Sequence, residues 1–187
     1  MIKINNLTKS FGKNLVIDNL NAELPACGIV TVTGPSGKGK TTFLNILAGI
    51  LKPDSGEIAG DPSSLSYSFQ DDRLFPWLSV RKNIEIVLPR YMQDKTEKIS
   101  FWLDSVELSE FSDYLPDKLS GGMKQRVSLA RALAYPSDIV LLDEPFAALD
   151  ETLHKKMYDL IKKEAKKRLI IMVTHDKKDI SEINIEI

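Results

Sequence analysis

Apolar and polar residues recur along this chain with two different periods, and the pattern predicts a mixed α/β fold. Ile2, Ile4 and Leu7 fit one half-buried strand, and the apolar positions within residues 15–24 fit a second. Gly12 lies between the two segments, where a tight turn is needed. We therefore expect this part of the chain to form an antiparallel sheet.

Continuous apolar runs predict buried strands at residues 29–33, 138–142 and 169–173. Shorter runs predict strands at residues 57–59, 65–69 and 183–187, the last of them at a sheet edge. Helical spacing or capping predicts helices within residues 43–49, 80–87, 94–108, 120–135 and 151–165. The pattern thus indicates one domain over residues 1–187, in which a helical subdomain at about 79–118 is inserted into an α/β core.

A glycine-rich segment at residues 34–42 matches G-x-x-x-x-G-K-[ST] and lies between a predicted strand and a predicted helix. Glycines let backbone N–H groups turn inward around an anion, and the helix start adds the positive end of its dipole. Lys40 brings a positive charge and Thr41 a hydroxyl for Mg²⁺. A chance glycine turn is disfavoured by this context. The expected phosphate contacts are Gly34, Pro35, Ser36, Gly37, Lys38, Gly39, Lys40, Thr41 and Thr42.

Polar residues follow other buried elements. Asp143 and Glu144 end one predicted buried strand, and His175 follows another. These residues therefore lie at the carboxyl ends of strands, which is where open α/β sheets bind ligands. Carboxylates there suit Mg²⁺. A solvated turn is the less favoured reading of the two acids, and a lone histidine is often structural. Residues 120–122, Ser-Gly-Gly, predict a second helix start that is able to bind an anion, although such caps are common.

Two aromatic features leave alternatives open. Phe11 stands in the first turn, where it either stacks on a nucleotide base or packs as an ordinary core or turn residue. Phe75, Pro76 and Trp77 form an apolar loop rimmed by charge, which is typical of a contact surface but also compatible with local core packing.

Composition narrows the class of protein further. The 187 residues carry a formal net charge of −1, so the basic footprint of a nucleic-acid binder is missing. The single cysteine, Cys27, excludes an internal disulfide and is expected to be a buried structural thiol. We see neither a signal peptide nor an apolar stretch of about 20 residues. We therefore expect a cytoplasmic protein that reaches a membrane only through partners.

The order of the motifs resembles that of an ABC transporter ATPase subunit over nearly the whole chain. The resemblance implies the ABC ATPase fold, which is an α/β P-loop NTPase core with an antiparallel β subdomain and an inserted helical subdomain. It also implies ATP and Mg²⁺ as cofactors. The matching segments are the Walker A motif at 34–42, the Q-loop at Gln70, the signature at 119–125, the Walker B motif at 139–144, the D-loop at 148–150 and the H-loop at His175.

Roles for individual residues follow from this resemblance. Lys40 would contact the β- and γ-phosphates, and Phe11 would stack on the base. Thr41 and Gln70 would ligate Mg²⁺, with Asp143 holding it through water. The implied catalytic residues are Glu144 as general base, His175 at the γ-phosphate, and Lys40.

The resemblance also implies that each site is shared between two subunits. Ser120, Gly121 and Gly122 would contact the ATP bound to the other subunit of an ATP-dependent homodimer. Ser120 and Asp150 would lie at the dimer interface.

Residues 69–80 resemble the Q-loop region of importers for nitrate, sulfonate, taurine and related solutes, and Met123 and residues 146–150 fit the same group. In that group the surface after the Q-loop receives a membrane subunit, which assigns Phe75, Pro76 and Trp77 to this contact. The expected partners are integral permease subunits and, indirectly, an extracellular or periplasmic solute-binding protein. The expected location is the cytoplasmic face of the membrane.

Lys38, where relatives have a small or apolar residue, departs from the pattern; it either adds charge near the phosphates or points to solvent. The chain also ends soon after His175 compared with relatives. The alternative function is a soluble, non-transport ABC ATPase such as an iron–sulfur assembly factor. The DNA-repair type is excluded because the stretch between Gln70 and Ser120 is too short for a long coiled coil. A non-hydrolysing module is disfavoured by Glu144 and His175.

Overall fold

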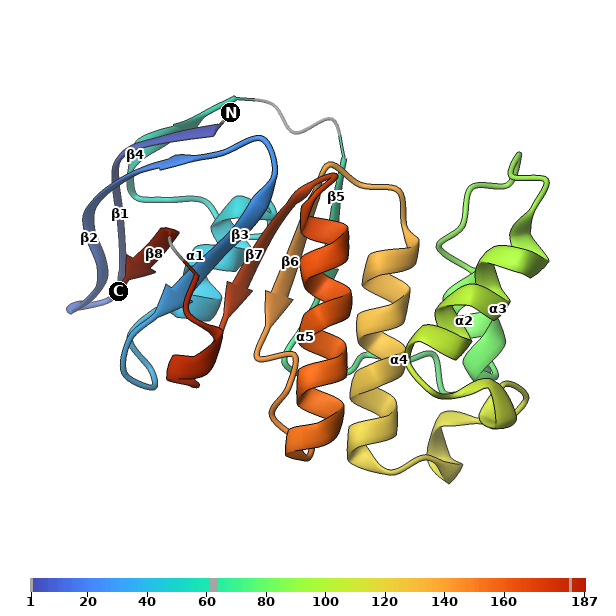
Figure 1. Cartoon of the computed structure of the whole chain (residues 1–187). Coiled ribbons are helices and arrows are strands. Elements are labelled where there is room, and N and C mark those ends of the chain that lie inside the picture. The colour runs from blue at the N-terminus through green and yellow to red at the C-terminus, as the bar shows by residue number, and fades with distance from the viewer. Residues whose placement is uncertain (1, 61–63, 182) are drawn as a thin grey trace.

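Two β-sheets form the frame of the molecule (Figure 1). The computed structural model describes residues 2–60, 64–181 and 183–187. Within these residues, β1 (Ile2–Phe11), β2 (Asn14–Leu24) and β4 (Ser55–Ala59) form an antiparallel sheet in the order β2-β1-β4. The second sheet is parallel, in the order β5-β6-β7-β3-β8; its strands are β3 (Gly28–Thr33), β5 (Leu65–Ser68), β6 (Ile139–Asp143), β7 (Leu169–Val173) and β8 (Ile183–Glu186).

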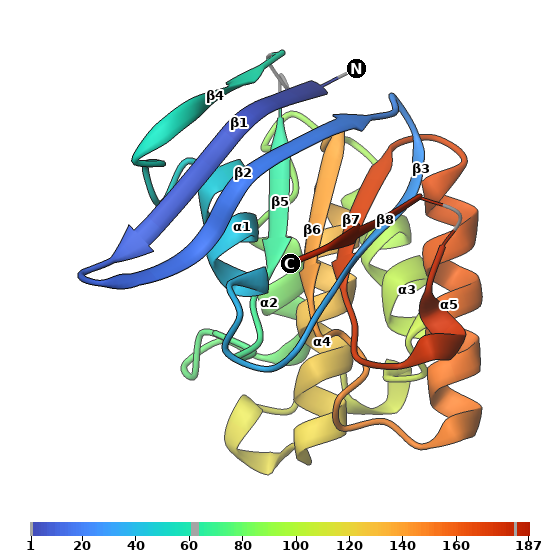
Figure 2. The ribbon, with the colours of Figure 1, turned by 90° about the vertical axis from the view of Figure 1, so that its left-hand side faces the viewer.

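The parallel sheet separates two hydrophobic clusters because successive side chains of a strand point to opposite faces. In β6, Ile139 and Leu141 belong to one cluster, and Val140 and Leu142 to the other. The first cluster lies under helix α1 (Lys40–Leu47) and the antiparallel sheet, and Figure 2 shows α1 between the two sheets. The fold is therefore α/β with an antiparallel β subdomain, as the sequence pattern predicts.

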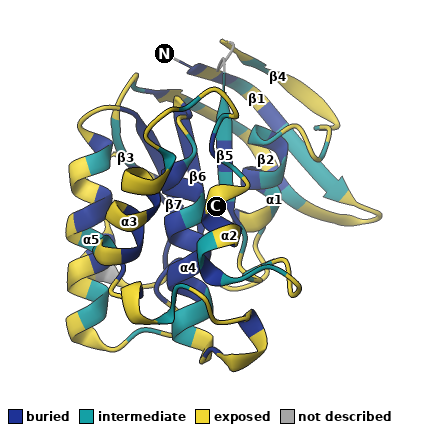
Figure 3. Ribbon diagram, turned by 90° about the vertical axis from the view of Figure 1, so that its right-hand side faces the viewer, coloured by how far each residue is buried: buried dark blue, intermediate teal, exposed yellow. Residues whose placement is uncertain are grey.

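Helices α4 (Gly121–Ala134) and α5 (Glu151–Ala165) cover the other face of the parallel sheet. Figure 3 shows that α4 is buried over much of its length, whereas α5 alternates between buried and exposed positions. The amphipathic pattern of α5 explains this, since Met157, Leu160, Ile161 and Ala165 are buried while its lysines point outward. The helices thus hold the ends of β6 and β7 in fixed positions.

The region between β5 and α4 is helical, as expected. It contains α2 (Val80–Glu85), α3 (Lys95–Ser105) and short 3-10 helices at Ser109–Phe111 and Pro116–Lys118. Both α-helices end earlier than the apolar spacing predicts, α3 because Glu107 adopts a left-handed backbone with φ of 55°. Asn83 is fully buried and accepts a hydrogen bond from the Phe75 N–H at 2.8 Å, so α2 holds the loop after Gln70 in place.

The final predicted strand is present as β8, which pairs in parallel with β3 at the edge of the sheet. One expectation is wrong: Cys27 is exposed rather than buried. The residue lies in the tight turn between β2 and β3, before the apolar run begins, so its side chain has no core to enter. Within the described residues, no helix combines the length and apolar character needed to cross a membrane.

Candidate functional site

Residues 34–39 connect β3 to α1 and form a loop that only glycine permits at two positions. Gly34 has a φ of 145°, and a Cβ there would lie 2.0 Å from the carbonyl oxygen of Ile187. Gly39 has a φ of 106°, and its Cβ would lie 2.4 Å from the Cγ1 atom of Val16. Both the left-handed backbone and the close neighbours exclude a side chain. The loop is therefore held against both β2 and the end of β8.

Lys40 is the first residue of α1 and is only 5% exposed. Its ammonium donates hydrogen bonds to the carbonyl oxygens of Gly34 at 3.0 Å and Pro35 at 2.9 Å. The charge is thus held across the inside of the loop, next to the N–H groups of the helix start. Lys38, in contrast, is exposed. An anion at this loop would meet the Lys40 ammonium and the helix dipole together.

A cavity of about 260 Å³ adjoins the loop and brings together three of the predicted motifs. Gln70 and Glu144 line it opposite the loop. The signature residues 120–122 are not part of this lining. The residues of the loop and of α1 that line the cavity are Ser36, Gly37, Gly39, Lys40, Thr41 and Thr42.

Asp143 ends β6 and is 2% exposed. Burial raises the pKa of Asp143; the Glu144 carboxylate adds to this shift, and the nearby Thr41 hydroxyl opposes it. Neither carboxylate oxygen has a hydrogen-bond partner of normal geometry among the described residues. A buried, unpartnered carboxylate beside a hydroxyl fits a hard divalent cation, which prefers oxygen ligands. The residues present thus fit Mg²⁺.

Glu144 has a left-handed backbone with φ of 50°, which turns its side chain out of the line of β6. Its N–H donates to the carbonyl of Val173 at 3.1 Å, and its Oε1 lies 2.7 Å from Nε2 of His175. The structure therefore brings the two predicted catalytic residues into direct contact across the ends of β6 and β7. Both side chains remain partly accessible, with exposed fractions of 23% for Glu144 and 47% for His175.

Gln125 is predicted only as part of the signature, but it also connects two motifs. Its Nε2 donates to the carbonyl oxygen of Glu144 at 2.8 Å, and its Oε1 accepts from the N–H of Ala148 at 2.9 Å. The side chain is 8% exposed, so both hydrogen bonds are sheltered from water. Gln125 thus ties α4 to the backbone of the proposed general base and to the segment that precedes Asp150.

Tyr67 is a second residue that sequence reasoning missed. Burial raises its pKa, and the nearby Asp143 carboxylate raises it further. The phenol hydroxyl lies near Asp143 but, like that carboxylate, has no hydrogen-bond partner of normal geometry among the described residues. The sequence offered one signal. Tyr67 lies two positions before the end of the predicted strand 65–69, and in a parallel sheet the end of this strand lies near the end of β6.

Ser120 is the N-cap of α4, and its hydroxyl accepts a hydrogen bond from the Met123 N–H at 3.3 Å. Ser120 and Gly121 are exposed. Gly122 has a structural reason to be glycine, since a Cβ would lie 2.7 Å from the carbonyl oxygen of Ala148. The start of α4 is thus exposed at Ser120 and Gly121 and lies outside the lining of the cavity next to the P-loop of the same chain.

Asp150 is the N-cap of α5 and accepts a hydrogen bond from the Leu153 N–H at 2.9 Å. Asp150→Ala is therefore expected to lower the free energy of unfolding by about 1 kcal/mol, because that N–H loses its acceptor. Asp150→Asn keeps an acceptor oxygen and is expected to lose clearly less. Urea denaturation of both variants checks this, and an equal loss in both would assign the effect to the charge instead.

The aromatic residues that the sequence singled out are exposed. Phe11 is 50% exposed at the end of β1, and Trp77 is 70% exposed. Phe75 and Pro76 are exposed as well, with the Phe75 ring 5.6 Å from that of Trp77. Packing into the local core is thereby excluded for residues 75–77, whereas an apolar contact surface is compatible with this exposure.

These features together define a P-loop nucleotide-binding protein. The glycine loop connects a parallel strand to a helix and holds a buried lysine, and carboxylates lie at the end of a nearby strand. The family model for ABC transporters matches residues 17–147. The chain belongs to the ABC transporter family.

Curated relatives cover most of the chain. A putative ATP-binding protein of Brucella abortus biovar 1 (strain 9-941) is 42% identical over 94% of this chain and 72% of its own length. The aliphatic sulfonates import ATP-binding protein SsuB of Bacillus anthracis is 39% identical over 94% of this chain and 75% of its own. A probable sulfate/thiosulfate import ATP-binding protein, CysA, of Chlorella vulgaris is 38% identical over 100% of this chain and 85% of its own length.

Solved structures give the same family. The ATP-binding cassette MJ0796, solved as a dimer in a post-hydrolysis state with ADP and Pi bound, matches with a TM-score of 0.83 and 31% identity. That match covers 96% of this chain and 90% of the cassette. A second dimeric structure of the same bacterial ABC transporter cassette matches with a TM-score of 0.86 and 30% identity. This match covers 100% of this chain and 94% of the cassette.

Proposed function

We propose that this chain is the ATP-binding and ATP-hydrolysing subunit that powers a membrane ABC importer for a small solute. The observation that carries the proposal is the cavity where the P-loop, Gln70 and Glu144 meet. The relatives named as import ATP-binding proteins support transport. The alternative of a soluble, non-transport ATPase is not favoured by these names.

The proposed chemistry uses positioning and charge rather than a covalent intermediate. Lys40 and the P-loop N–H groups bind the phosphates, and Phe11 stacks on the base. Thr41, Gln70 and Asp143 would hold Mg²⁺, which neutralises charge on the phosphates. Glu144 accepts the proton of the attacking water, and His175, 2.7 Å from it, keeps the carboxylate in position near the γ-phosphate.

The proposed active form is a homodimer with ATP between the two subunits. Residues 120–122 do not line the P-loop cavity of their own chain, which supports an arrangement in which a second chain brings them to the nucleotide. The similar cassette has been solved as a dimer. The exposed start of α4 suits the γ-phosphate of an ATP bound to the partner, because the first N–H groups of a helix have no acceptor within the helix. Because the site is completed only on closure, hydrolysis is coupled to a movement.

The proposed membrane contact is the loop of Phe75, Pro76 and Trp77. It is exposed and apolar, and Asn83 of α2 fixes its backbone. We propose that permease subunits bind this loop on the cytoplasmic face of the membrane, and that a solute-binding protein acts on the other side. The names of the relatives favour a small oxyanion-type solute such as a sulfonate or sulfate.

Trp77→Ala is expected to reduce the membrane-bound fraction of the chain by at least about tenfold, because a large aromatic anchor contributes much of an interface's binding energy. ATP hydrolysis by the isolated chain is expected to stay unchanged. The measurement is the share of the tagged chain that sediments with membranes of the producing cells. Tyr91→Ala is the matched control, since Tyr91 is 86% exposed but lies outside this loop. Equal membrane binding by both variants would contradict the proposed contact.

A further inference from the structure

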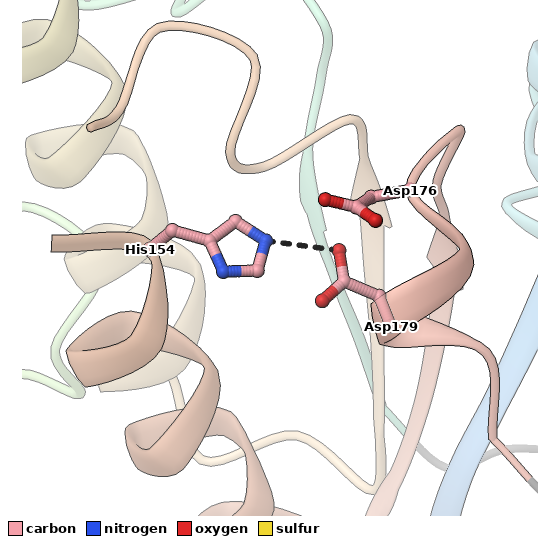
Figure 4. A group of neighbouring side chains, drawn as sticks. All are labelled: His154, Asp176 and Asp179. Atoms are coloured by element: carbon pink, nitrogen blue, oxygen red, sulfur yellow. Dashed lines mark hydrogen bonds and ion pairs between the residues drawn. The ribbon is translucent and has the colours of Figure 1, made fainter. Parts of the chain in front are cut away.

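A second group of metal-binding side chains lies beyond β7, outside the proposed Mg²⁺ site. His154 comes from α5, whereas Asp176 and Asp179 come from the segment after His175, and Figure 4 shows the three pointing toward one another. One ligand atom from each residue lies within 4.8 Å of the others. They line a cavity of about 270 Å³, whose wall includes neither Thr41 nor Asp143. This group is therefore separate from the proposed magnesium ligands.

Asp179 gives an independent indication that the group binds something. The side chain is 1% exposed, and its Oδ1 has no hydrogen-bond partner among the described residues. Its Oδ2 accepts a hydrogen bond from Thr174 Oγ1 at 3.1 Å and lies 3.1 Å from His154 Nε2. Leaving a carboxylate oxygen buried and unpartnered is costly. A cation bound to Oδ1 of Asp179 would remove this cost.

We propose that His154, Asp176 and Asp179 bind one divalent transition-metal ion of the Zn²⁺ class. An imidazole nitrogen with two carboxylates suits zinc, whereas Mg²⁺ prefers oxygen ligands alone. Zinc needs ligand atoms somewhat closer together than 4.8 Å. Asp176 is exposed, and because its Oδ1 accepts a hydrogen bond from the Lys178 N–H at 2.9 Å, its Oδ2 is the atom that would bind the metal. Thr174 then acts as the outer partner that orients the Asp179 carboxylate.

The charges around the group favour a cation. With a neutral imidazole, the two aspartates leave the group negative. Lys178, which directly precedes Asp179, is already paired with Glu151 at 3.2 Å. A bound metal would connect α5 to the segment that carries His175, because its ligands come from both.

The test is equilibrium dialysis of the metal-stripped, nucleotide-free full chain against ZnCl₂. Cys27 is exposed and able to bind zinc by itself, so every protein carries Cys27→Ser. The chain is expected to bind one zinc ion. His154→Gln and Asp176→Asn are each expected to weaken binding by at least about tenfold. Asp159→Asn, an exposed acid on the same helix, is the matched control and is expected to bind normally.

A thermal-unfolding scan with and without zinc gives a second readout that does not depend on activity. Zinc is expected to raise the midpoint of the parent chain but not that of His154→Gln. The absence of zinc uptake by the parent chain would overturn the proposal, as would unchanged uptake by His154→Gln. Loss of zinc from His175→Gln with retention in His154→Gln would place the metal on the Glu144–His175 pair instead and would also overturn it.

Discussion

Glu144→Gln is expected to lower the rate of ATP hydrolysis by at least about 100-fold, because an amide cannot accept the proton of the attacking water. ATP binding is expected to persist, since the P-loop and Lys40 are untouched. The backbone is expected to keep its shape, because the contacts of residue 144 with Val173 and Gln125 use main-chain atoms. A dimer with ATP bound is expected to accumulate because the nucleotide is not hydrolysed. Phosphate release measures hydrolysis, a fluorescent ATP analogue measures binding, and size-exclusion chromatography with ATP measures the dimer.

The left-handed backbone at residue 144 does not add a stability effect to the Glu144→Gln test. Glutamate already adopts φ of 50° there, and glutamine has the same branching and size, so the strain is unchanged. Glu110→Gln, at an exposed position outside the proposed site, is the control for loss of a surface charge. Unchanged phosphate release from Glu144→Gln would remove Glu144 from the role of general base.

Much of the fold follows from local sequence patterns. The runs at residues 138–142 and 169–173 are apolar at nearly every position because β6 and β7 are covered on both faces. The glycine loop is recognisable because its backbone geometry tolerates no other residue at Gly34 and Gly39. Strand ends of a parallel sheet meet at one edge, so the closeness of Glu144 and His175 is also predictable in outline.

What the sequence does not reveal depends on contacts between residues far apart in the chain. Gln125 bonds to the backbone of residues 144 and 148, and no local pattern marks such a side chain. His154 lies among the polar residues of an amphipathic helix and resembles a surface residue until Asp179 is placed beside it. For Cys27 the sequence misleads in the opposite direction. Its apolar neighbours predict a buried side chain, but the turn that contains it faces water.

The second large effect is a recovery of activity on mixing two inactive variants. Lys40→Ala removes the ammonium that spans the P-loop. Gly121→Asp places a negative charge at the start of α4, where a Cβ meets no atom within 4 Å and an acid favours the helix dipole. The second variant is therefore expected to fold while repelling the phosphates of the partner's ATP. Each variant alone is expected to be nearly inactive.

In the proposed dimer the P-loop of one chain faces the signature of the other, so in a mixed dimer both defects would fall in the same site. The second site then combines an intact P-loop with an intact signature. An equal mixture is expected to recover up to about a quarter of the activity of the unaltered chain, since half of the dimers are mixed and each has one intact site. Gly121→Ala, which adds a methyl group without charge, is the control and is expected to stay active. Phosphate release measured across mixing ratios tests this directly. Activity no higher than the sum of the two variants would contradict a shared site, since a P-loop and a signature acting within one chain leave both defects unrescued.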